Sequence, residues 1–482
     1  MSTPRRAPAH ALVVFGASGD LTSRKLVPAL EALRSQGSLP DDWAFVGVGR
    51  SDLGDDGFRR QVSEAGWTGE TDRLRWVAGD YRDAATFDRV QAVLGESGAS
   101  NFLHYLATPP AVFLDIVRGL GAAGLATPAG DDGFARIVIE KPFGRDLASA
   151  AELDAGIHQV FAEEQVYRID HYLGKETVQN VLALRFANAI FEPIWNRRYV
   201  NHVQITVAET LGVGHRGEFY EEAGALRDIV QNHLLQVLAL TCMEPPASID
   251  AQGIRDEKVK ALRAVDILTP EEVPTDVVRA QYDAGLVDGE HSVSYRKEEG
   301  VAADSTTETY VAMKLRVDNW RWAGVPFYLR TGKRLQKRLT EVAMLFNDVP
   351  HLPFKAKAAR GLRTNALILR IQPDEGITLR FGAKVPGQEF EVRSVRMDFS
   401  YDESFAEAPH DAYERLLMDA MSGDPTLFIR ADEVDQAWRI VDPVLQAWED
   451  PEVPLDRYPA GSWGPRDADL LLARDGRRWR SP

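Results

Sequence analysis

A buried strand that runs directly into a glycine turn and a helix sets the first constraint on the fold. Residues 11–15, Ala-Leu-Val-Val-Phe, form a continuous apolar run, which is typical of a parallel strand covered on both faces. The segment G-A-S-G-D-L-T (16–22) follows at once, and apolar residues then recur at helical spacing over 26–33. This order brings backbone N–H groups against a pyrophosphate. The spacing departs from GxGxxG because the second glycine comes one residue late, so a simple tight turn is the alternative.

Further buried strands follow in the first third of the chain. Strand-like runs occupy residues 44–48, 74–78, 102–107 and 136–139, with helix-like segments between them. Alternating strands and helices predict a Rossmann-type, doubly wound parallel sheet of the α/β class. A chain of 482 residues is too long for one core. We therefore predict a dinucleotide-binding domain over residues 1–170 and a second, larger domain over residues 171–482.

The second part of the chain changes to a period of two. Apolar and polar residues alternate over 203–208, 310–317, 366–371 and 377–381, and 342–346 is another strand-like run. Such runs with few helices between them predict an α+β domain with a broad, mainly antiparallel sheet. Because a broad sheet can pair two subunits face to face, we expect a homodimer or homotetramer.

Net charge and cysteine content limit the classes of binding partner and the cellular location that we expect. The formal net charge is −16, from 72 acidic and 56 basic residues, so nucleic acid and anionic membranes are not expected as partners. No apolar run approaches the roughly 18 residues of a membrane span, and residues 1–10 do not resemble a secretory signal. Cys242 is the only cysteine, which excludes a disulfide within the chain and fits a cytoplasmic location.

The end of the second strand indicates which dinucleotide is bound. Residues 44–48 lead into Gly49-Arg50-Ser51, where an NAD enzyme usually carries an acidic residue for the ribose 2′-hydroxyl. Arginine suits a 2′-phosphate instead, so Arg50 favours NADP, with NAD as a weaker alternative. Lys25 on the first helix can reach the same phosphate. The alternatives are a surface arginine at a strand end and a lysine on a solvated helix face.

Two later strand ends carry chemistry at the edge where ligands bind in such sheets. Tyr105 precedes a sharp Thr-Pro-Pro turn, and Lys141 lies in E-K-P-F-G, where it can serve cofactor and substrate together. The predicted cofactor-binding residues are Gly16, Ser18, Gly19, Asp20, Leu21, Lys25, Arg50, Tyr105 and Lys141.

The densest cluster of functional groups is R-I-D-H-Y-L-G-K-E, residues 168–176. It combines a carboxylate, an imidazole, a phenol and an ammonium just before apolar residues at helical spacing, which predict a helix beginning near Gly174. A helix start with cations beside it can receive a phosphate. The alternative is a helix start with ordinary surface charge.

A second helix, predicted over residues 225–236, carries His233 on the same face as Leu226, Ile229 and Leu234. His233 is either a core histidine satisfied by one hydrogen bond or a proton acceptor at a cleft between domains. Glu209 ends the strand at 203–208 and can accept from sugar hydroxyls. Lys333 and Arg338 supply further cations for a dianionic phosphate.

Several of these motifs, in the same order, resemble those of the glucose-6-phosphate dehydrogenase family from Phe15 to Val441. The matching pieces are G-A-S-G-D-L, E-K-P-F-G, R-I-D-H-Y-L-G-K-E, R-D-I-V-Q-N-H-L-L-Q, T-G-K with Arg338, and A-Y-E-R-L-L. The resemblance implies oxidation of D-glucose 6-phosphate at C1 to 6-phospho-D-glucono-1,5-lactone. The hydride passes to NADP in this reaction, which is the first step of the oxidative pentose phosphate pathway.

The resemblance also implies a role for each matching residue. His233 resembles the general base, and Asp170 the carboxylate that orients its imidazole. The implied substrate-binding residues are Lys141, His171, Tyr172, Lys175, Glu209, Asp228, Lys333 and Arg338. No metal is implied. Some members carry a second, structural NADP site with a longer C-terminal tail, and the end of this chain gives no reason to expect it.

Two other functions are compatible with parts of the pattern. A Rossmann dehydrogenase of the EKP type can act on an unphosphorylated sugar, although a neutral substrate does not need the cations at Lys175, Lys333 and Arg338. A non-enzymatic sensor of NADP and sugar phosphate is the other alternative. It is disfavoured because His233 and Asp170 are both present.

Overall fold

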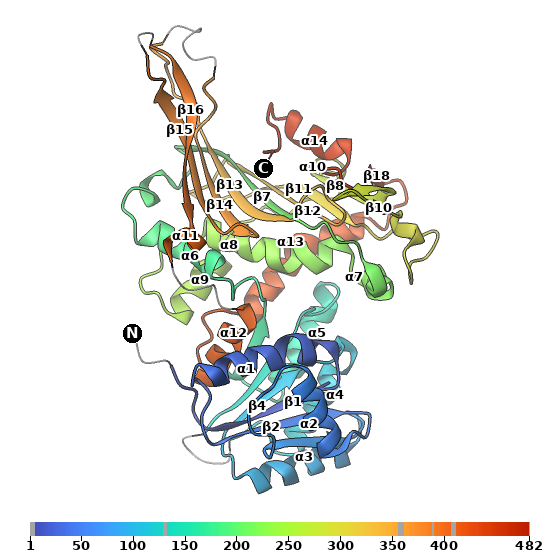
Figure 1. The fold of residues 1–482 in the computed structure, drawn as a ribbon. Coiled ribbons are helices and arrows are strands. Elements are labelled where there is room, and N and C mark those ends of the chain that lie inside the picture. Colours follow the sequence, from blue (N-terminus) through green and yellow to red (C-terminus); the bar gives the residue numbers. More distant parts are fainter. Residues whose placement is uncertain (1–4, 129–132, 355–360, 388–389, 406–410, 482) are drawn as a thin grey trace. The chain divides into compact units, whose positions relative to one another are not determined.

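The computed structural model describes residues 5–128, 133–354, 361–387, 390–405 and 411–481. The chain divides into two compact units, each with its own large sheet (Figure 1). The first unit comprises residues 1–176, 246–256 and 410–435, and the second comprises 177–245, 257–409 and 436–482. The domain boundary at residue 170 stays a prediction.

The sheet of the first unit is a doubly wound parallel sheet, as predicted. In the described residues its strand order is β17-β6-β5-β4-β1-β2-β3, so the order reverses at β1. The parallel strands are β1 (His10–Phe15), β2 (Trp43–Gly49), β3 (Leu74–Ala78), β4 (Phe102–Leu106), β5 (Ala135–Ile139) and β6 (Val166–Ile169). Strand β17 (Phe428–Ile429) pairs antiparallel with β6. Neither β6 nor β17 was predicted from the sequence.

Helices cover both faces of this sheet (Figure 1), which is why every residue of β1 is buried. The helical segments are the π-helix η1 (Thr22–Leu26), α1 (Val27–Ser35), α2 (Gly54–Glu64), α3 (Ala84–Ser97), α4 (Phe113–Ala122), α5 (Leu147–His158) and α12 (Ala412–Ser422). Helices α3 and α5 begin with Asp83 and Asp146, whose carboxylates accept from backbone N–H groups of the first turn.

Buried charge ties the later segments into the first unit. The Arg168 guanidinium is almost fully buried and lies 2.9 Å from Glu163 and 2.7 Å from Asp154. Glu163 also accepts from Arg255 at 3.4 Å and from the Ala431 N–H at 3.0 Å. One carboxylate therefore joins β6, residues 246–256 and the start of α13 (Ala431–Ala447).

The sheet of the second unit is mainly antiparallel, as predicted. Its order in the described chain is β16-β15-β14-β13-β7-β12-β11-β8-β18, and β7–β12 and β8–β18 are its parallel pairs there. The strands are β7 (Val200–Ala208), β8 (Val277–Asp283), β11 (Tyr310–Arg316), β12 (Pro326–Gly332), β13 (Leu339–Phe346), β14 (Ala366–Gln372), β15 (Gly376–Lys384), β16 (Val392–Ser400) and β18 (Asp456–Pro459). Strands β8, β12, β16 and β18 were not predicted.

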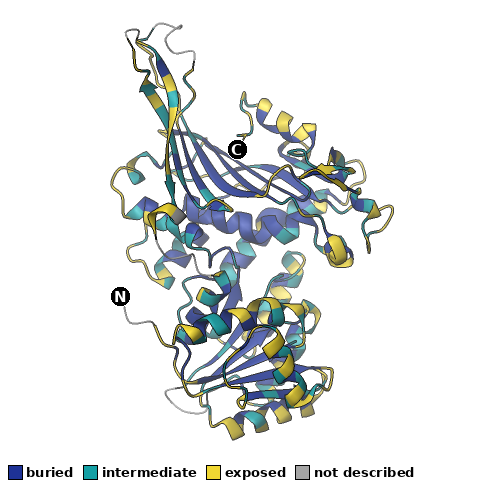
Figure 2. Cartoon of the chain, viewed as in Figure 1, coloured by how far each residue is buried: buried dark blue, intermediate teal, exposed yellow. Residues whose placement is uncertain are grey.

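Helices of the second unit include the segment expected over residues 225–236, but with a different winding. Residues Leu226–Leu234 form a π-helix, η6, which continues into α8 (Leu235–Cys242) and packs against β7 and β12. Figure 2 shows this helix as almost entirely buried. Other helices are α6 (Glu176–Phe186), α7 (Gly217–Ala225) and α14 (Arg466–Ala473), and α9 (Ala251–Arg263) begins in the first unit and ends in the second.

Helix length and hydropathy give no sign of a membrane span. Within the described residues, no helix is both long enough and apolar enough to cross a bilayer.

Buried histidines make the first unit sensitive to acid. His104 in β4 is fully buried, its Nε2 lies 2.8 Å from the Leu125 carbonyl oxygen, and burial lowers its pKa from 6.5 to about 4. His104 takes up a proton near pH 6.5 in the unfolded chain, but only near pH 4 in the folded chain. The stability from neutral His104 is therefore full above pH 6.5 and declines between pH 6.5 and 4.

We expect His104→Gln to reduce the dependence of unfolding free energy on pH in this window by up to about 1.4 kcal/mol per pH unit. Urea unfolding at pH 7.5, 6.0 and 5.0 measures this slope. The exposed His291, changed to Gln, is the control and should leave the slope as in the wild type. Equal slopes for His104→Gln and the wild type would show that His104 does not carry the effect.

Candidate functional site

The glycine turn after β1 is built by close backbone contacts. Gly16 has φ +83°, and its N–H donates to the Val48 carbonyl oxygen at 2.8 Å. A Cβ at this position would lie 2.5 Å from the Ala107 carbonyl oxygen, so only glycine fits. The Gly19 N–H closes the turn by donating to the Gly16 carbonyl oxygen at 2.9 Å. The backbone thus passes from a buried strand to the start of η1 in the way that a dinucleotide phosphate needs.

The other predicted cofactor residues of this region lie on or beside the same turn. Ser18 and Asp20 are exposed, and Gly19 and Leu21 are partly exposed. Arg50 is exposed and follows Val48, the residue that accepts from Gly16, by two positions. Strands β1 and β2 run parallel, with Phe15 opposite Val48, so Arg50 and the glycine turn share one edge of the sheet.

Lys25 does not stand as an isolated cation. It lies in η1, and its Nζ is 3.1 Å from a carboxylate oxygen of Asp411, the residue that caps α12. The Lys25 ammonium is also 5.9 Å from the Tyr413 ring centroid. A cofactor phosphate at this position would compete with Asp411, and a role for Lys25 in cofactor binding stays a prediction.

Tyr105 uses its hydroxyl to hold Glu140, the residue before Lys141. The Tyr105 hydroxyl donates to Glu140 Oε1 at 2.5 Å, and the Tyr413 hydroxyl donates to the same oxygen at 3.1 Å. Burial raises the pKa of Glu140 and of both phenols. Two phenols therefore orient the carboxylate at the start of E-K-P-F-G. Tyr105 was predicted to bind the cofactor, and its contact with Glu140 and the contribution of Tyr413 were not predicted.

Residues 170–175 form one turn that gathers three predicted substrate residues. Asp170 is buried and accepts from the Tyr172 N–H through its carboxylate at 2.9 Å. The rings of His171 and Tyr172 meet edge to face at 5.1 Å, and Lys175 Nζ lies 4.1 Å from the Tyr172 ring centroid. Helix α6 begins at the next residue. An imidazole, a phenol and an ammonium thus meet at a helix start, as the sequence predicted.

Close packing also explains the glycine in this turn. A Cβ at Gly174 would lie 2.8 Å from the Ala412 carbonyl oxygen and 3.0 Å from the Ala412 Cβ. The first residue of α12 therefore packs directly on the turn, and a larger residue at Gly174 would separate the two.

Glu209 and Lys333, predicted separately from distant parts of the chain, form an ion pair in the second unit. Lys333 Nζ lies 2.6 Å from Glu209 Oε2. The parallel pairing of β7 and β12 places Ala208 opposite Gly332, so the residues that follow them are neighbours. The Lys333 side chain is 6% exposed and the Glu209 side chain 37%, so the pair is reached by solvent from the Glu209 end.

The π-helix η6 presents Asp228 and His233 in the same unit. Asp228 is partly exposed near its start, whereas His233 is buried among aliphatic residues. Glu308 caps this helix, because the Leu226 N–H donates to Glu308 Oε1 at 2.9 Å and the Ala225 N–H donates to the Glu308 carbonyl oxygen at 3.0 Å. His233 is thus buried, and the choice between a core histidine and a proton acceptor at a cleft between domains stays open. Glu308 had no signal in the sequence.

Arg338 is exposed, in the stretch before β13, and its predicted contact with the substrate stays a prediction.

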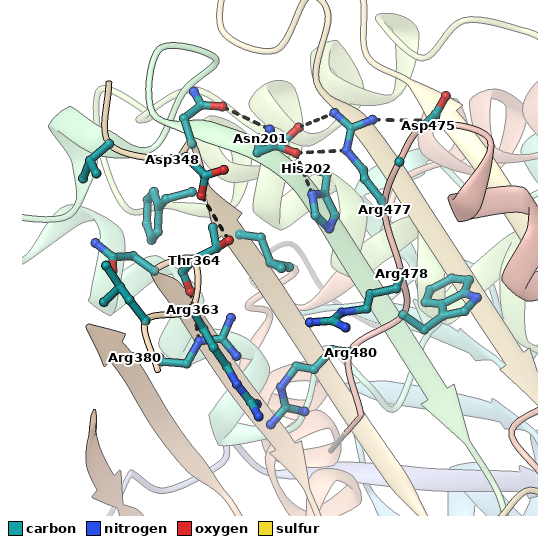
Figure 3. A pocket seen from close by; sticks show the side chains of 18 of the residues that line it. Asn201, His202, Asp348, Arg363, Thr364, Arg380, Asp475, Arg477, Arg478 and Arg480 are labelled. Carbon is teal, nitrogen blue, oxygen red and sulfur yellow. Dashed lines mark hydrogen bonds and ion pairs between the residues drawn. The ribbon is translucent and has the colours of Figure 1, made fainter. Parts of the chain in front are cut away.

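A cavity that is rich in arginine lies in the second unit (Figure 3). Its volume is about 930 Å³, and residues 475–481 form one wall. Its guanidinium groups belong to Arg363, Arg380, Arg477, Arg478 and Arg480. Arg477 donates to Asn201 Oδ1 at 2.9 Å and Arg480 to Glu341 Oε1 at 2.6 Å. None of the predicted site residues lines this cavity.

Two family models match nearly the whole chain. "Glucose-6-phosphate dehydrogenase, NAD binding domain" matches residues 13–180, and "Glucose-6-phosphate dehydrogenase, C-terminal domain" matches residues 182–480.

Curated relatives and solved structures agree with these matches. The chain is 49% identical to "Glucose-6-phosphate 1-dehydrogenase 2" of Mycobacterium bovis, over 99% of this chain and 96% of that protein. It is 48% identical to "Glucose-6-phosphate 1-dehydrogenase" of Aggregatibacter actinomycetemcomitans, over 98% and 97%. A crystal structure of the Mycobacterium avium enzyme superposes with a TM-score of 0.84 at 38% identity, covering 99% of both chains. A glucose-6-phosphate dehydrogenase solved with its substrate glucose-6-phosphate superposes with a TM-score of 0.88 at 34% identity, covering 100% of both.

Gly16→Ala tests whether the turn is a dinucleotide site. The new Cβ meets the Ala107 carbonyl oxygen, so the turn must open, and we expect NADP affinity to fall by at least roughly 10-fold. Isothermal titration measures this. The matched control is Gly37→Ala, which also has a positive φ (+73°) but no atom within 4 Å of its Cβ position. It should cost about 1 kcal/mol of stability and leave NADP affinity unchanged. An equal loss of affinity in both variants would contradict the assignment.

Proposed function

Because this chain belongs to the glucose-6-phosphate dehydrogenase family, a family of oxidoreductases, we propose that it oxidises D-glucose 6-phosphate at C1 to 6-phospho-D-glucono-1,5-lactone with NADP as hydride acceptor. The observation that carries this proposal is the turn at residues 170–175, with its imidazole, phenol and ammonium before α6. A phosphate ester needs such a set of donors and cations, whereas a neutral sugar does not.

Substrate binding is proposed to use both ends of the sugar phosphate. His171, Tyr172 and Lys175 hold the phosphate, and Lys333 and Arg338 add positive charge. Glu209 and Asp228 accept from sugar hydroxyls, since carboxylates are acceptors only. The Glu209–Lys333 ion pair places an acceptor and a donor 2.6 Å apart at one position that solvent reaches, where a sugar hydroxyl can contact both.

The residues of the glycine turn fit a dinucleotide, and the proposed acceptor is NADP. Gly16 allows close backbone approach to the pyrophosphate, and Arg50 at the same sheet edge is placed for a 2′-phosphate. Ser18, Gly19, Asp20 and Leu21 complete the turn, and Lys25, Tyr105 and Lys141 keep their proposed contacts with the cofactor. The nicotinamide supplies the electrophilic carbon that accepts the hydride.

His233 is proposed as the general base and Asp170 as the carboxylate that orients it. Removal of the C1 hydroxyl proton by the imidazole leaves electron density that expels the hydride from C1. An adjacent carboxylate fixes the imidazole tautomer and stabilises the protonated ring. The π-helix that carries His233 is capped at its start by Glu308 and packs against β7 and β12.

The cellular setting follows from the same proposal. The reaction is the first step of the oxidative pentose phosphate pathway, and we place the enzyme in the cytoplasm, where the single buried Cys242 stays a thiol. A homodimer or homotetramer is proposed because strand β16, at the edge of the large sheet, exposes apolar residues including Met397.

A coupled assay tests the proposal directly. Purified protein with glucose 6-phosphate and NADP should generate NADPH absorbance, with much lower rates on glucose. A folded sample that reduces no NADP in the presence of glucose 6-phosphate would exclude this function. Equal rates on glucose and glucose 6-phosphate would support the neutral-sugar dehydrogenase instead.

His233→Asn tests the general base. We expect kcat to fall about 10²–10⁴-fold with KM close to its original value, because the imidazole acts on the transition state. Steady-state kinetics with both substrates measures this. His202→Asn, a second buried histidine of this unit on the arginine-rich cavity, should leave kcat unchanged. A large rise in KM with kcat intact would assign His233 to binding.

Arg50→Ala tests the choice of cofactor. Loss of a charge-assisted contact should weaken NADP about 10–100-fold and change NAD less than about 2-fold. Titration of each dinucleotide gives the two dissociation constants. The matched control is Arg60→Ala, an exposed arginine on α2, which should change neither. Equal weakening of NADP and NAD would remove the 2′-phosphate role from Arg50.

A further inference from the structure

We propose that Tyr220 is a further substrate-contacting residue, whose hydroxyl donates a hydrogen bond to a sugar hydroxyl held by Glu209 and Asp228. This inference rests on the proposed function and adds a residue that the sequence did not single out. It concerns binding and orientation of the sugar, and it involves no covalent step.

Tyr220 lies directly beneath the ion pair of the second unit. It belongs to α7, is 3% exposed, and its ring meets that of Tyr295 edge to face at 6.1 Å. Lys333 Nζ lies 4.9 Å from the Tyr220 ring centroid while it contacts Glu209 at 2.6 Å. The phenol is thus fixed on one side by aromatic packing, and it supports the Lys333 ammonium on the other.

The hydroxyl of Tyr220 differs from those of three tyrosines packed around it. Tyr282 donates to Glu298 at 2.9 Å, Tyr295 to Glu221 at 2.5 Å, and Tyr458 to the Lys333 carbonyl oxygen at 2.6 Å. The hydroxyls of Tyr220 and Tyr310 are both buried without a hydrogen-bond partner among the described residues, but the Tyr310 hydroxyl lies beside Arg330, a group that can donate to it. The Tyr220 hydroxyl lies among carboxylates instead. A buried hydroxyl without a partner costs about 1–3 kcal/mol, which a ligand that accepts from Tyr220 would offset.

Charge around the phenol makes it a donor. The carboxylates of Asp228, Glu308 and Glu209 lie close enough that, after burial itself, they raise the pKa of Tyr220 further above its usual value of 10. The phenol therefore keeps its proton at physiological pH. Glu308 is already engaged with the start of η6, whereas Glu209 and Asp228 are both partly exposed.

A sugar hydroxyl needs both hydrogen-bond acceptors and hydrogen-bond donors, and this cluster has both. Each hydroxyl donates one hydrogen bond and accepts others, and the Glu209 and Asp228 carboxylates can only accept. A hydroxyl that donates to one of them still has lone pairs that require donors. Lys333 supplies N–H donors, and Tyr220 supplies an O–H donor. The cluster of Glu209, Asp228, Lys333 and Tyr220 is then complementary to a polyol.

Tyr220→Phe tests the proposal because it removes the hydroxyl and keeps the ring under Lys333. With glucose 6-phosphate we expect kcat/KM to fall roughly 3- to 15-fold, the range of one neutral hydrogen bond. The assay is repeated with the 2-deoxy, 3-deoxy and 4-deoxy analogues of glucose 6-phosphate. For the analogue that lacks the contacted hydroxyl, wild type and Tyr220→Phe should be equally active.

Tyr310→Phe is the matched control. Tyr310 is buried in the same aromatic core, and its hydroxyl lies near Arg330 rather than the carboxylates. It should leave kcat/KM unchanged for every sugar. Thermal unfolding of both variants shows that they are folded.

Three outcomes overturn the inference or its premise separately. Unchanged kcat/KM in Tyr220→Phe excludes the contact. An equal loss with all three deoxy analogues shows that Tyr220 acts through another residue, so it does not touch the sugar. Wild-type protein without activity on glucose 6-phosphate refutes the proposed function itself, independently of Tyr220.

Discussion

The parallel pairing of β7 with β12 is the constraint on which the second unit depends. Antiparallel neighbours would place the ends of these strands at opposite edges of the sheet, whereas parallel pairing puts Ala208 beside Gly332. The next residues, Glu209 and Lys333, are then forced together, and the Glu209 N–H donates to the Gly332 carbonyl oxygen at 3.0 Å. The π-helix η6 packs on the same two strands. One backbone register therefore fixes an acceptor, a cation and the helix that carries the proposed base.

Local patterns were enough to predict much of the fold. The apolar run at 11–15, the glycine turn and the later buried runs predicted the parallel sheet. A strand covered on both faces is apolar at every position, and the sequence shows this directly. Alternation of apolar and polar residues at 203–208 and 366–371 predicted the second, mainly antiparallel sheet. Strands β6 and β17 were missed because they are short, and β17 is two residues long in the described chain. Strand β12 was missed because Arg330 and Thr331 interrupt its apolar pattern, although both are buried.

Site residues that are close in sequence were predicted correctly to lie together, whereas partners that are distant in sequence were not. His171, Tyr172 and Lys175 are sequence neighbours, so a single turn brings them together, as expected. The partners that the sequence did not reveal come from far away. Glu308 reaches the start of η6, and the Tyr413 hydroxyl reaches Glu140. The role of a buried carboxylate or phenol depends on a hydrogen-bond partner that the tertiary fold brings close. The sequence around such a residue does not identify that partner. Tyr220 belongs to the same class.

The discontinuous make-up of the first unit has a consequence for biosynthesis. Strand β17 completes the edge of a sheet whose other strands leave the ribosome far earlier, and it pairs with β6 through Phe428 and Ile169. Helix α12 receives the Arg136 guanidinium at its carbonyl groups and covers Gly174. Until these residues emerge, a nascent chain displays β6 as a bare edge, the kind of template on which other chains aggregate. Premature termination before residue 411 would leave that edge unpaired. The sheet of the first unit can therefore be completed only when translation is nearly finished.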